Sequence, residues 1–150
     1  MKLFLRIVVV LSVMLFLVLV TISIYQQLVD TPKAALVETK LQTEFNSLAV
    51  LPSSRAVKPL SSYKAGQAMV GCTYSTDNSY GNIRAYYDAE FAKNGWQKYK
   101  EETVKYKAND YGGKVVYYRK GDYVGSLEYS GNNPNLNWTF AIYVSWGINF

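Results

Sequence analysis

The first hydrophobic segment of the chain is continuous, whereas the later ones are periodic. Residues 7–24 (IVVVLSVMLFLVLVTISI) carry no charge, and their only polar side chains are Ser12, Thr21 and Ser23. In an α-helix each residue adds about 1.5 Å, so this segment spans roughly 27 Å, close to the thickness of the hydrocarbon core of a bilayer. Residues 1–25 are therefore predicted to form a short cytoplasmic start and a transmembrane anchor.

The charges around this segment predict its orientation. Lys2 and Arg6 precede it, and the first charge after it is Asp30. By the positive-inside rule the N-terminus is cytoplasmic and the remainder of the chain is extracytoplasmic. A cleavable signal peptide is the alternative, but the apolar run is longer than usual and no typical small-residue cleavage site follows it. We expect an uncleaved single-pass anchor.

A helical period follows the anchor. After a short, mostly polar stem at residues 26–33, apolar side chains recur at spacings of four, four and three, which is typical of one face of a helix. These side chains are Val37, Leu41, Phe45 and Leu48. The helix either covers the core of the next domain or continues the stalk. Residues 51–67 contain Pro52, Pro59 and Gly66 and are predicted to be an irregular connection. Residues 26–67 thus form a stem, an amphipathic helix and a connecting loop.

Residues 68–75 have the pattern of a strand, and a second helix is predicted at residues 82–94. Asp77, Asn78 or Ser79 can cap its first turn. Its apolar face consists of Ile83, Tyr86, Tyr87 and Phe91. Gly95 stands where a helix commonly ends, and Trp96 is placed to fold back on the last turn.

From Trp96 onward the period is two, which indicates antiparallel strands. Tyr99 breaks the alternation of residues 96–107, so a bulge or an early strand end is expected there. Lys120-Gly121-Asp122 is a tight-turn signal between two strands. The final strand is predicted at residues 137–146, with alternate side chains facing one side. These are Trp138, Phe140, Ile142, Val144 and Trp146. The fold class is therefore α+β: an N-terminal transmembrane helix, then a small antiparallel sheet domain (residues 68–150) with one helix packed on it.

The composition argues against catalysis. The chain has no histidine, one cysteine (Cys72), no Gly-rich phosphate loop and no Gly-x-Ser-x-Gly turn. Glu101 and Glu102 are neighbours on a strand and would face opposite sides of it. Cys72 lies in a strand pattern and is expected to be buried. We expect no enzyme activity, no catalytic residues, no metal site and no cofactor. The modest net charge of +5 does not favour nucleic acid as a partner.

Aromatic residues are the remaining candidates for function, because 13 of the 14 tyrosines and all three tryptophans lie beyond residue 25. They either fill the core of a small sheet or form a platform for a partner protein or a sugar. Lysines after the second helix either protect a solvated edge strand or contact an anionic group. The candidate partner contacts are Tyr99, Tyr111, Tyr118, Tyr143, Lys98 and Lys100.

Three segments carry a resemblance to known proteins: residues 83–96 (IRAYYDAEFAKNGW), residues 118–123 (YRKGDY) and residues 144–147 (VSWG). Together they resemble a module of small bacterial envelope proteins of uncharacterised function, which are membrane-anchored or secreted. In that module a helix ending in Gly-Trp leads into an antiparallel sheet. The resemblance covers about residues 68–147. It implies a bacterial envelope location and no catalytic residues.

The expected function is that of a bacterial inner-membrane protein whose extracytoplasmic domain binds another envelope component. The anchor contacts lipid through residues 7–24, and the partner is expected to be a protein, with this chain as a small accessory subunit. Two alternatives remain. One is a glycan-binding module that uses exposed tyrosines, and the other is an immunity protein against a periplasmic toxin.

Overall fold

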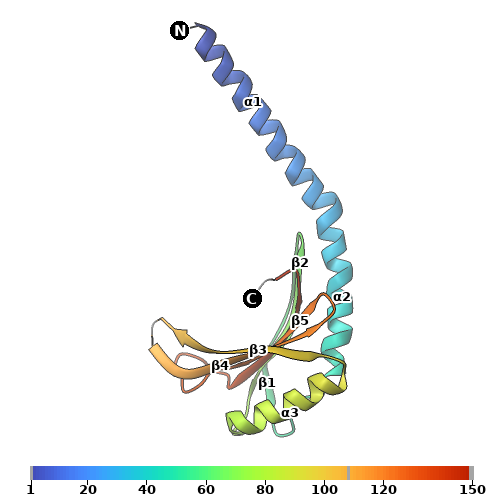
Figure 1. The fold of residues 1–150 in the computed structure, drawn as a ribbon, viewed down its shortest axis with the longest axis vertical. Coiled ribbons are helices and arrows are strands. Elements are labelled where there is room, and N and C mark those ends of the chain that lie inside the picture. Colours follow the sequence, from blue (N-terminus) through green and yellow to red (C-terminus); the bar gives the residue numbers. More distant parts are fainter. Residues whose placement is uncertain (1, 108, 149–150) are drawn as a thin grey trace.

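The computed structural model describes residues 2–107 and 109–148. Helix α1 (Lys2–Tyr25) continues through a π-helical turn (Gln26–Asp30) into helix α2 (Thr31–Ser47). The backbone stays helical at both junctions, and the Thr31 hydroxyl donates to the Gln26 carbonyl at 2.9 Å. Figure 1 shows one long helical arm that bends between α1 and α2, where the π-turn lies.

The side chains of α1 from Val10 to Tyr25 are all exposed. Phe16, near the middle, exposes 64% of its surface. Within the described residues this is the one helix that is long and apolar enough to cross a membrane. The structure therefore agrees with the prediction of a single membrane-spanning segment at the N-terminus.

The described residues also contain a six-stranded antiparallel sheet with the spatial order β1-β2-β6-β5-β4-β3. Its strands are β1 (Arg55–Lys64), β2 (Gln67–Ser75), β3 (Gln97–Tyr106), β4 (Asn109–Lys120), β5 (Tyr123–Tyr129) and β6 (Phe140–Trp146). The chain is thus α+β, as predicted, and the turn at residues 120–122 joins β4 to β5.

Strand β1 corrects the prediction of an irregular connection at residues 51–67. The prolines in this segment suggested a loop, but Pro59 lies inside β1, paired with Cys72. A proline is tolerated there because β1 is an edge strand and needs only one set of ladder hydrogen bonds. Its side chains are largely exposed, so it lacks the apolar alternation by which strands are recognised.

Helix α2 packs on the sheet through the predicted apolar face. Ala34 and Leu41 are fully buried, and Leu48 exposes 6% of its surface. At its C-terminal half, Glu44 pairs with Lys120 at 2.7 Å. The alternative that the sequence left open is therefore resolved: α2 both continues the anchor and covers the core.

Helix α3 (Tyr80–Lys93) is capped by the Ser79 hydroxyl, one of the three predicted caps. Gly95 ends the helix at a φ of 81°, and the Trp96 ring meets Phe91 edge to face at 5.6 Å. Phe91 also stands directly over Gly125, where a Cβ atom would overlap its ring. This close approach lets α3 lie flat on the sheet.

Both α2 and α3 contribute to one hydrophobic core on the same side of a strongly curved sheet (Figure 1). Core side chains on β6 are Phe140, Ile142 and Val144, as predicted. Within the described residues neither of these helices covers the other side of the sheet. We call that other side the open face.

Strand β3 contains a bulge, and strand β6 begins later than predicted. The register of β3 against β4 shifts between Lys98 and Lys100, so of the two alternatives expected near Tyr99 the bulge is confirmed. The last strand begins at Phe140 and not at residue 137. Trp138 therefore precedes the strand and does not share the core side of Phe140. It lines cavities with residues of the open face.

Candidate functional site

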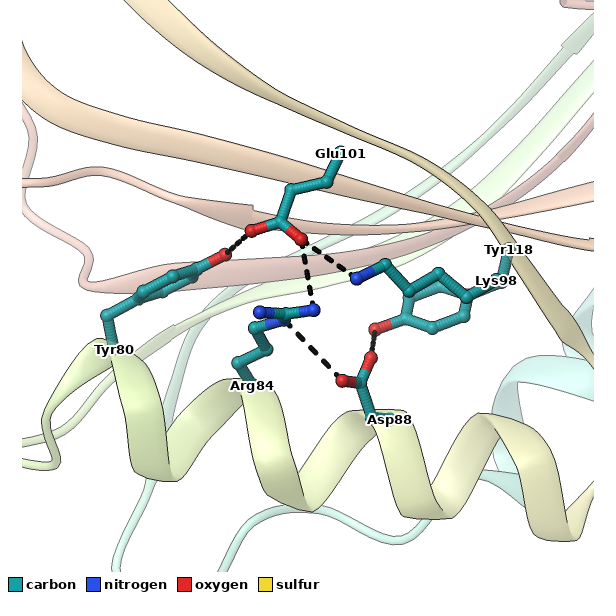
Figure 2. Close-up of polar contacts among 6 residues, drawn as sticks. All are labelled: Tyr80, Arg84, Asp88, Lys98, Glu101 and Tyr118. Carbon is teal, nitrogen blue, oxygen red and sulfur yellow. Dashed lines mark hydrogen bonds and ion pairs between the residues drawn. The ribbon is translucent and has the colours of Figure 1, made fainter.

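A cluster of polar side chains joins α3 to the edge of the sheet (Figure 2). Arg84 Nη2 lies 3.0 Å from Glu101 Oε2, and its Nε lies 3.5 Å from Asp88 Oδ2. The Tyr118 hydroxyl donates to Asp88 at 2.7 Å. Lys98 Nζ completes the cluster at 2.8 Å from Glu101, and the Tyr80 hydroxyl donates to the same carboxylate at 3.1 Å.

The electrostatics of this cluster are those of a structural contact. The hydrogen bond from Lys98 lowers the pKa of Glu101, with a smaller contribution from Tyr80. Burial, followed by the Glu101 hydrogen bond, raises the pKa of Tyr80 to about 12, and burial raises that of Tyr118 further. Glu101 is held ionised between Arg84 and Lys98, and both phenols are held protonated. The cluster fastens α3 to β3 and β4 and leaves no group ready to transfer a proton at neutral pH.

The six candidate contacts predicted from sequence do not form a single surface. Tyr118 is 1% exposed, and its ring stacks on Phe91 with centroids 4.0 Å apart. The prediction that Tyr118 contacts a partner is therefore wrong, because its side chain is buried in the core. Of the adjacent pair Tyr117 and Tyr118, one had to face the core, and Tyr118 does so because it pairs with Gly125, beneath Phe91.

Lys98 and Lys100 are separated by the bulge at Tyr99. Lys98 pairs with Tyr118 on the helix side and contacts Glu101. Lys100 pairs with Tyr117 on the open face, where its ammonium lies 2.8 Å from Glu102 and 5.2 Å from the Tyr117 ring centroid. The bulge thus divides the two predicted lysines between the two sides of the sheet, and both are already paired.

The other three predicted tyrosines belong to the open face. The Tyr99 ring lies 6.1 Å from that of Tyr117, and the guanidinium of Arg119 stacks on it at 4.6 Å. Tyr143 lies against Gly71, where a Cβ atom would overlap its ring, so this glycine allows the ring to lie close to the sheet. Tyr111 lines a cavity farther along the same face. The open face therefore carries several aromatic rings that are not part of the hydrophobic core.

The open face also carries a carboxyl group without a partner. On the inner strand β5, Glu128 pairs with Val115 of β4 and with Ala141 of β6. Burial raises the pKa of Glu128. Burial is also the main cause of the raised pKa values of Tyr117 and Tyr143, to which the charge of Glu128 adds a smaller contribution. Among the described residues Glu128 receives no hydrogen bond and forms no ion pair, in contrast to Glu101 and Glu102.

Glu128 lines a cavity of about 270 Å³ near the end of the sheet where β3 turns into β4. The other lining residues are mainly apolar or aromatic: Val104, Tyr106, Tyr111, Gly113, Val115, Tyr129, Ser130, Asn133, Leu136 and Trp138. Ser130 donates its hydroxyl to the Thr139 carbonyl at 3.0 Å, and the Asn133 side-chain oxygen accepts from Asn135. Glu128 is therefore a carboxylate without an ion pair among the described residues, in a cavity with mainly aromatic and aliphatic walls.

We predict that the substitution Glu128→Gln stabilises the domain at neutral pH. Because the pKa of Glu128 is raised in the folded state, its cost to stability is absent below its ordinary pKa and grows as pH rises through its raised pKa. Removing a half-buried, unpaired carboxylate is expected to add up to about 1 kcal/mol to the free energy of unfolding at pH 7. Tryptophan fluorescence during urea unfolding at pH 7 and pH 4 measures this difference.

Glu102→Gln is the matched control, since the hydrogen bond from Lys100 lowers the pKa of Glu102. Its contribution has the opposite sign: stabilising above the ordinary pKa and lost as pH falls through the lowered one. A gain for Glu128→Gln that is as large at pH 4 as at pH 7 would contradict the assignment to its charge.

No known protein family, curated protein or solved structure matches this chain. The site is therefore defined by its geometry alone. The candidate contacts predicted from sequence include Tyr99, Tyr111 and Tyr143 but neither Glu128 nor Trp138. Alternation along residues 123–130 sets Glu128 on the side opposite Leu127, but no sequence signal shows that Trp138 lies beside it.

Proposed function

We propose that this chain is a membrane-anchored binding protein, without catalytic activity of its own, that presents the open face of its sheet to a partner protein in the bacterial envelope. The uncovered aromatic face carries this proposal. Aromatic residues are enriched in protein interfaces, where rigid rings bury much area and lose little entropy. Tyr99 still exposes 41% of its surface.

The apolar helix α1 supports the location in this proposal. With Lys2 and Arg6 before the span and Asp30 after it, the positive-inside rule favours a cytoplasmic N-terminus and an extracytoplasmic sheet domain. The bacterial inner membrane is the membrane in which such a protein would serve as an accessory subunit of a larger complex.

Site-specific photocrosslinking in intact cells tests the proposal. A benzophenone amino acid is placed in the full chain at Tyr99 or Tyr143 on the open face, or at Lys93 on α3 as the control. The Lys93 side chain exposes 72% of its surface on the opposite side of the domain. We expect a discrete adduct from the open-face positions and none from position 93.

The adduct should be reproducible and should contain one envelope protein by mass spectrometry. Equal crosslinking from position 93, or only unmodified monomer from both open-face positions, would refute the use of this face.

A further inference from the structure

The residues that line the cavity beside Glu128 limit the kinds of chemical group that can bind there. The walls of the cavity are aliphatic and aromatic, and Val115 beneath it exposes only 7% of its surface. Trp138 and Tyr111 present rings, and Glu128 presents the one carboxylate. A group that fills it must therefore combine an apolar body with a positive end or a hydrogen-bond donor.

Resting on the proposed function, we propose that this cavity binds a lysine or arginine side chain of the partner protein, with Glu128 as the counter-ion and Trp138 and Tyr111 beside the aliphatic stem. The carboxylate would gain the partner it lacks within the described chain. Aromatic faces favour cations, and the long stems of lysine and arginine suit apolar walls.

The size of the cavity supports a single side chain. Pockets that enclose a drug-sized ligand usually measure about 300–1,000 Å³, and this one measures about 270 Å³. A sugar would also need several donors and acceptors around it. The Ser130 hydroxyl and the Asn133 side-chain oxygen already have partners within their own loop. Glu128 is the one charged group that lines the cavity.

One lysine of this chain lies over a ring that lines the cavity. The Lys107 ammonium lies 5.5 Å from the ring centroid of Tyr106, which lines the cavity. It forms no ion pair with Glu128 among the described contacts. A cation thus lies over one of the rings that line the cavity, while the Glu128 carboxylate has no ion pair among the described residues. Lys107 would compete electrostatically with an incoming cation, so its removal is expected to strengthen binding.

Nuclear magnetic resonance on the full chain in detergent micelles tests this pocket directly. The probes are the Nα-acetyl amides of lysine and arginine, the uncharged norleucine amide, and N-acetylglucosamine. The signal is the indole N–H resonance of Trp138, assigned with Trp138→Phe. We expect saturable shifts with both cationic amides and none with norleucine or the sugar.

Glu128→Gln is expected to weaken binding of both cationic amides by about tenfold or more, as the loss of a charge-assisted hydrogen bond implies. The matched control Glu102→Gln removes a carboxylate that is already paired with Lys100, and should leave binding unchanged. Lys107→Gln should tighten it. Shifts that are equal for norleucine and lysine amides, a response to the sugar alone, or unchanged binding in Glu128→Gln would each overturn the pocket assignment.

The same variants separate this inference from the proposed function. If the Tyr99 crosslink to the partner persists in Glu128→Gln and the probes do not bind, the open face remains the interface but the cationic pocket is wrong. If no partner crosslinks at the open face while the lysine amide binds through Glu128, the pocket stands as a cation site and the proposed interface is wrong.

Discussion

Leu41→Ala is expected to cost about 2–5 kcal/mol of the free energy of unfolding of the sheet domain. Leu41 is fully buried between α2 and the sheet, so shortening it removes apolar contact and leaves a cavity. The loss should be measured by urea unfolding of the full chain in micelles, followed by tryptophan fluorescence. All three tryptophans lie in the sheet domain, so this signal reports on it and not on α1.

Leu36→Ala provides the matched control on the same helix. Leu36 exposes 69% of its surface, and its truncation should change stability by no more than about 0.5 kcal/mol. Similar losses for the two variants would mean that α2 does not pack on the sheet through the Leu41 side. The comparison therefore tests both the register of α2 and its role as a cover of the core.

The double substitution Leu15→Asp and Leu19→Asp is expected to abolish stable membrane association. Both residues lie near the middle of α1, and both are exposed, at 62% and 57%. A carboxylate at the centre of a membrane-spanning helix costs about 3 kcal/mol, and two should therefore shift insertion by more than 1,000-fold. Fractionation of cells followed by alkaline extraction of the membranes measures the retained protein.

The control is the pair Leu15→Ala and Leu19→Ala, which preserves helix propensity and adds no charge. It should stay with the membrane fraction after alkaline extraction. Complete retention of the double-Asp variant would argue that something other than α1 holds the protein at the membrane.

The elements with a strong local period were predictable from the sequence. Helix α3 has the expected buried stripe and the expected stop at Gly95, and its cap is Ser79, one of the three residues predicted for that role. The apolar stripe of α2 is also correct. Strand β1 was missed because an edge strand with mostly exposed side chains has no apolar alternation, and Pro59 imitates a loop.

The candidate site was less predictable, because it depends on contacts between distant segments. Alternation along β4 shows that one of Tyr117 and Tyr118 must leave the core, but not which one. The pairing of Tyr118 with Gly125 under Phe91 decides this, and that pairing requires the fold. The cavity of Glu128 likewise needs Trp138 from the loop before β6. Such long-range neighbours have no signature in a single sequence.

The continuous helix from α1 to α2 fixes the position of the sheet domain relative to α1 and so limits where a partner can bind. No flexible tether separates the two helices, and α2 is fixed to the domain by Leu41 and by the Glu44–Lys120 ion pair. At about 1.5 Å per residue, the 17 residues of α2 extend roughly 25 Å. On the proposed anchoring, the domain stays close above the lipid headgroups, and any tilting of α1 in the bilayer turns the aromatic surface with it. This arrangement favours other membrane-embedded proteins as partners.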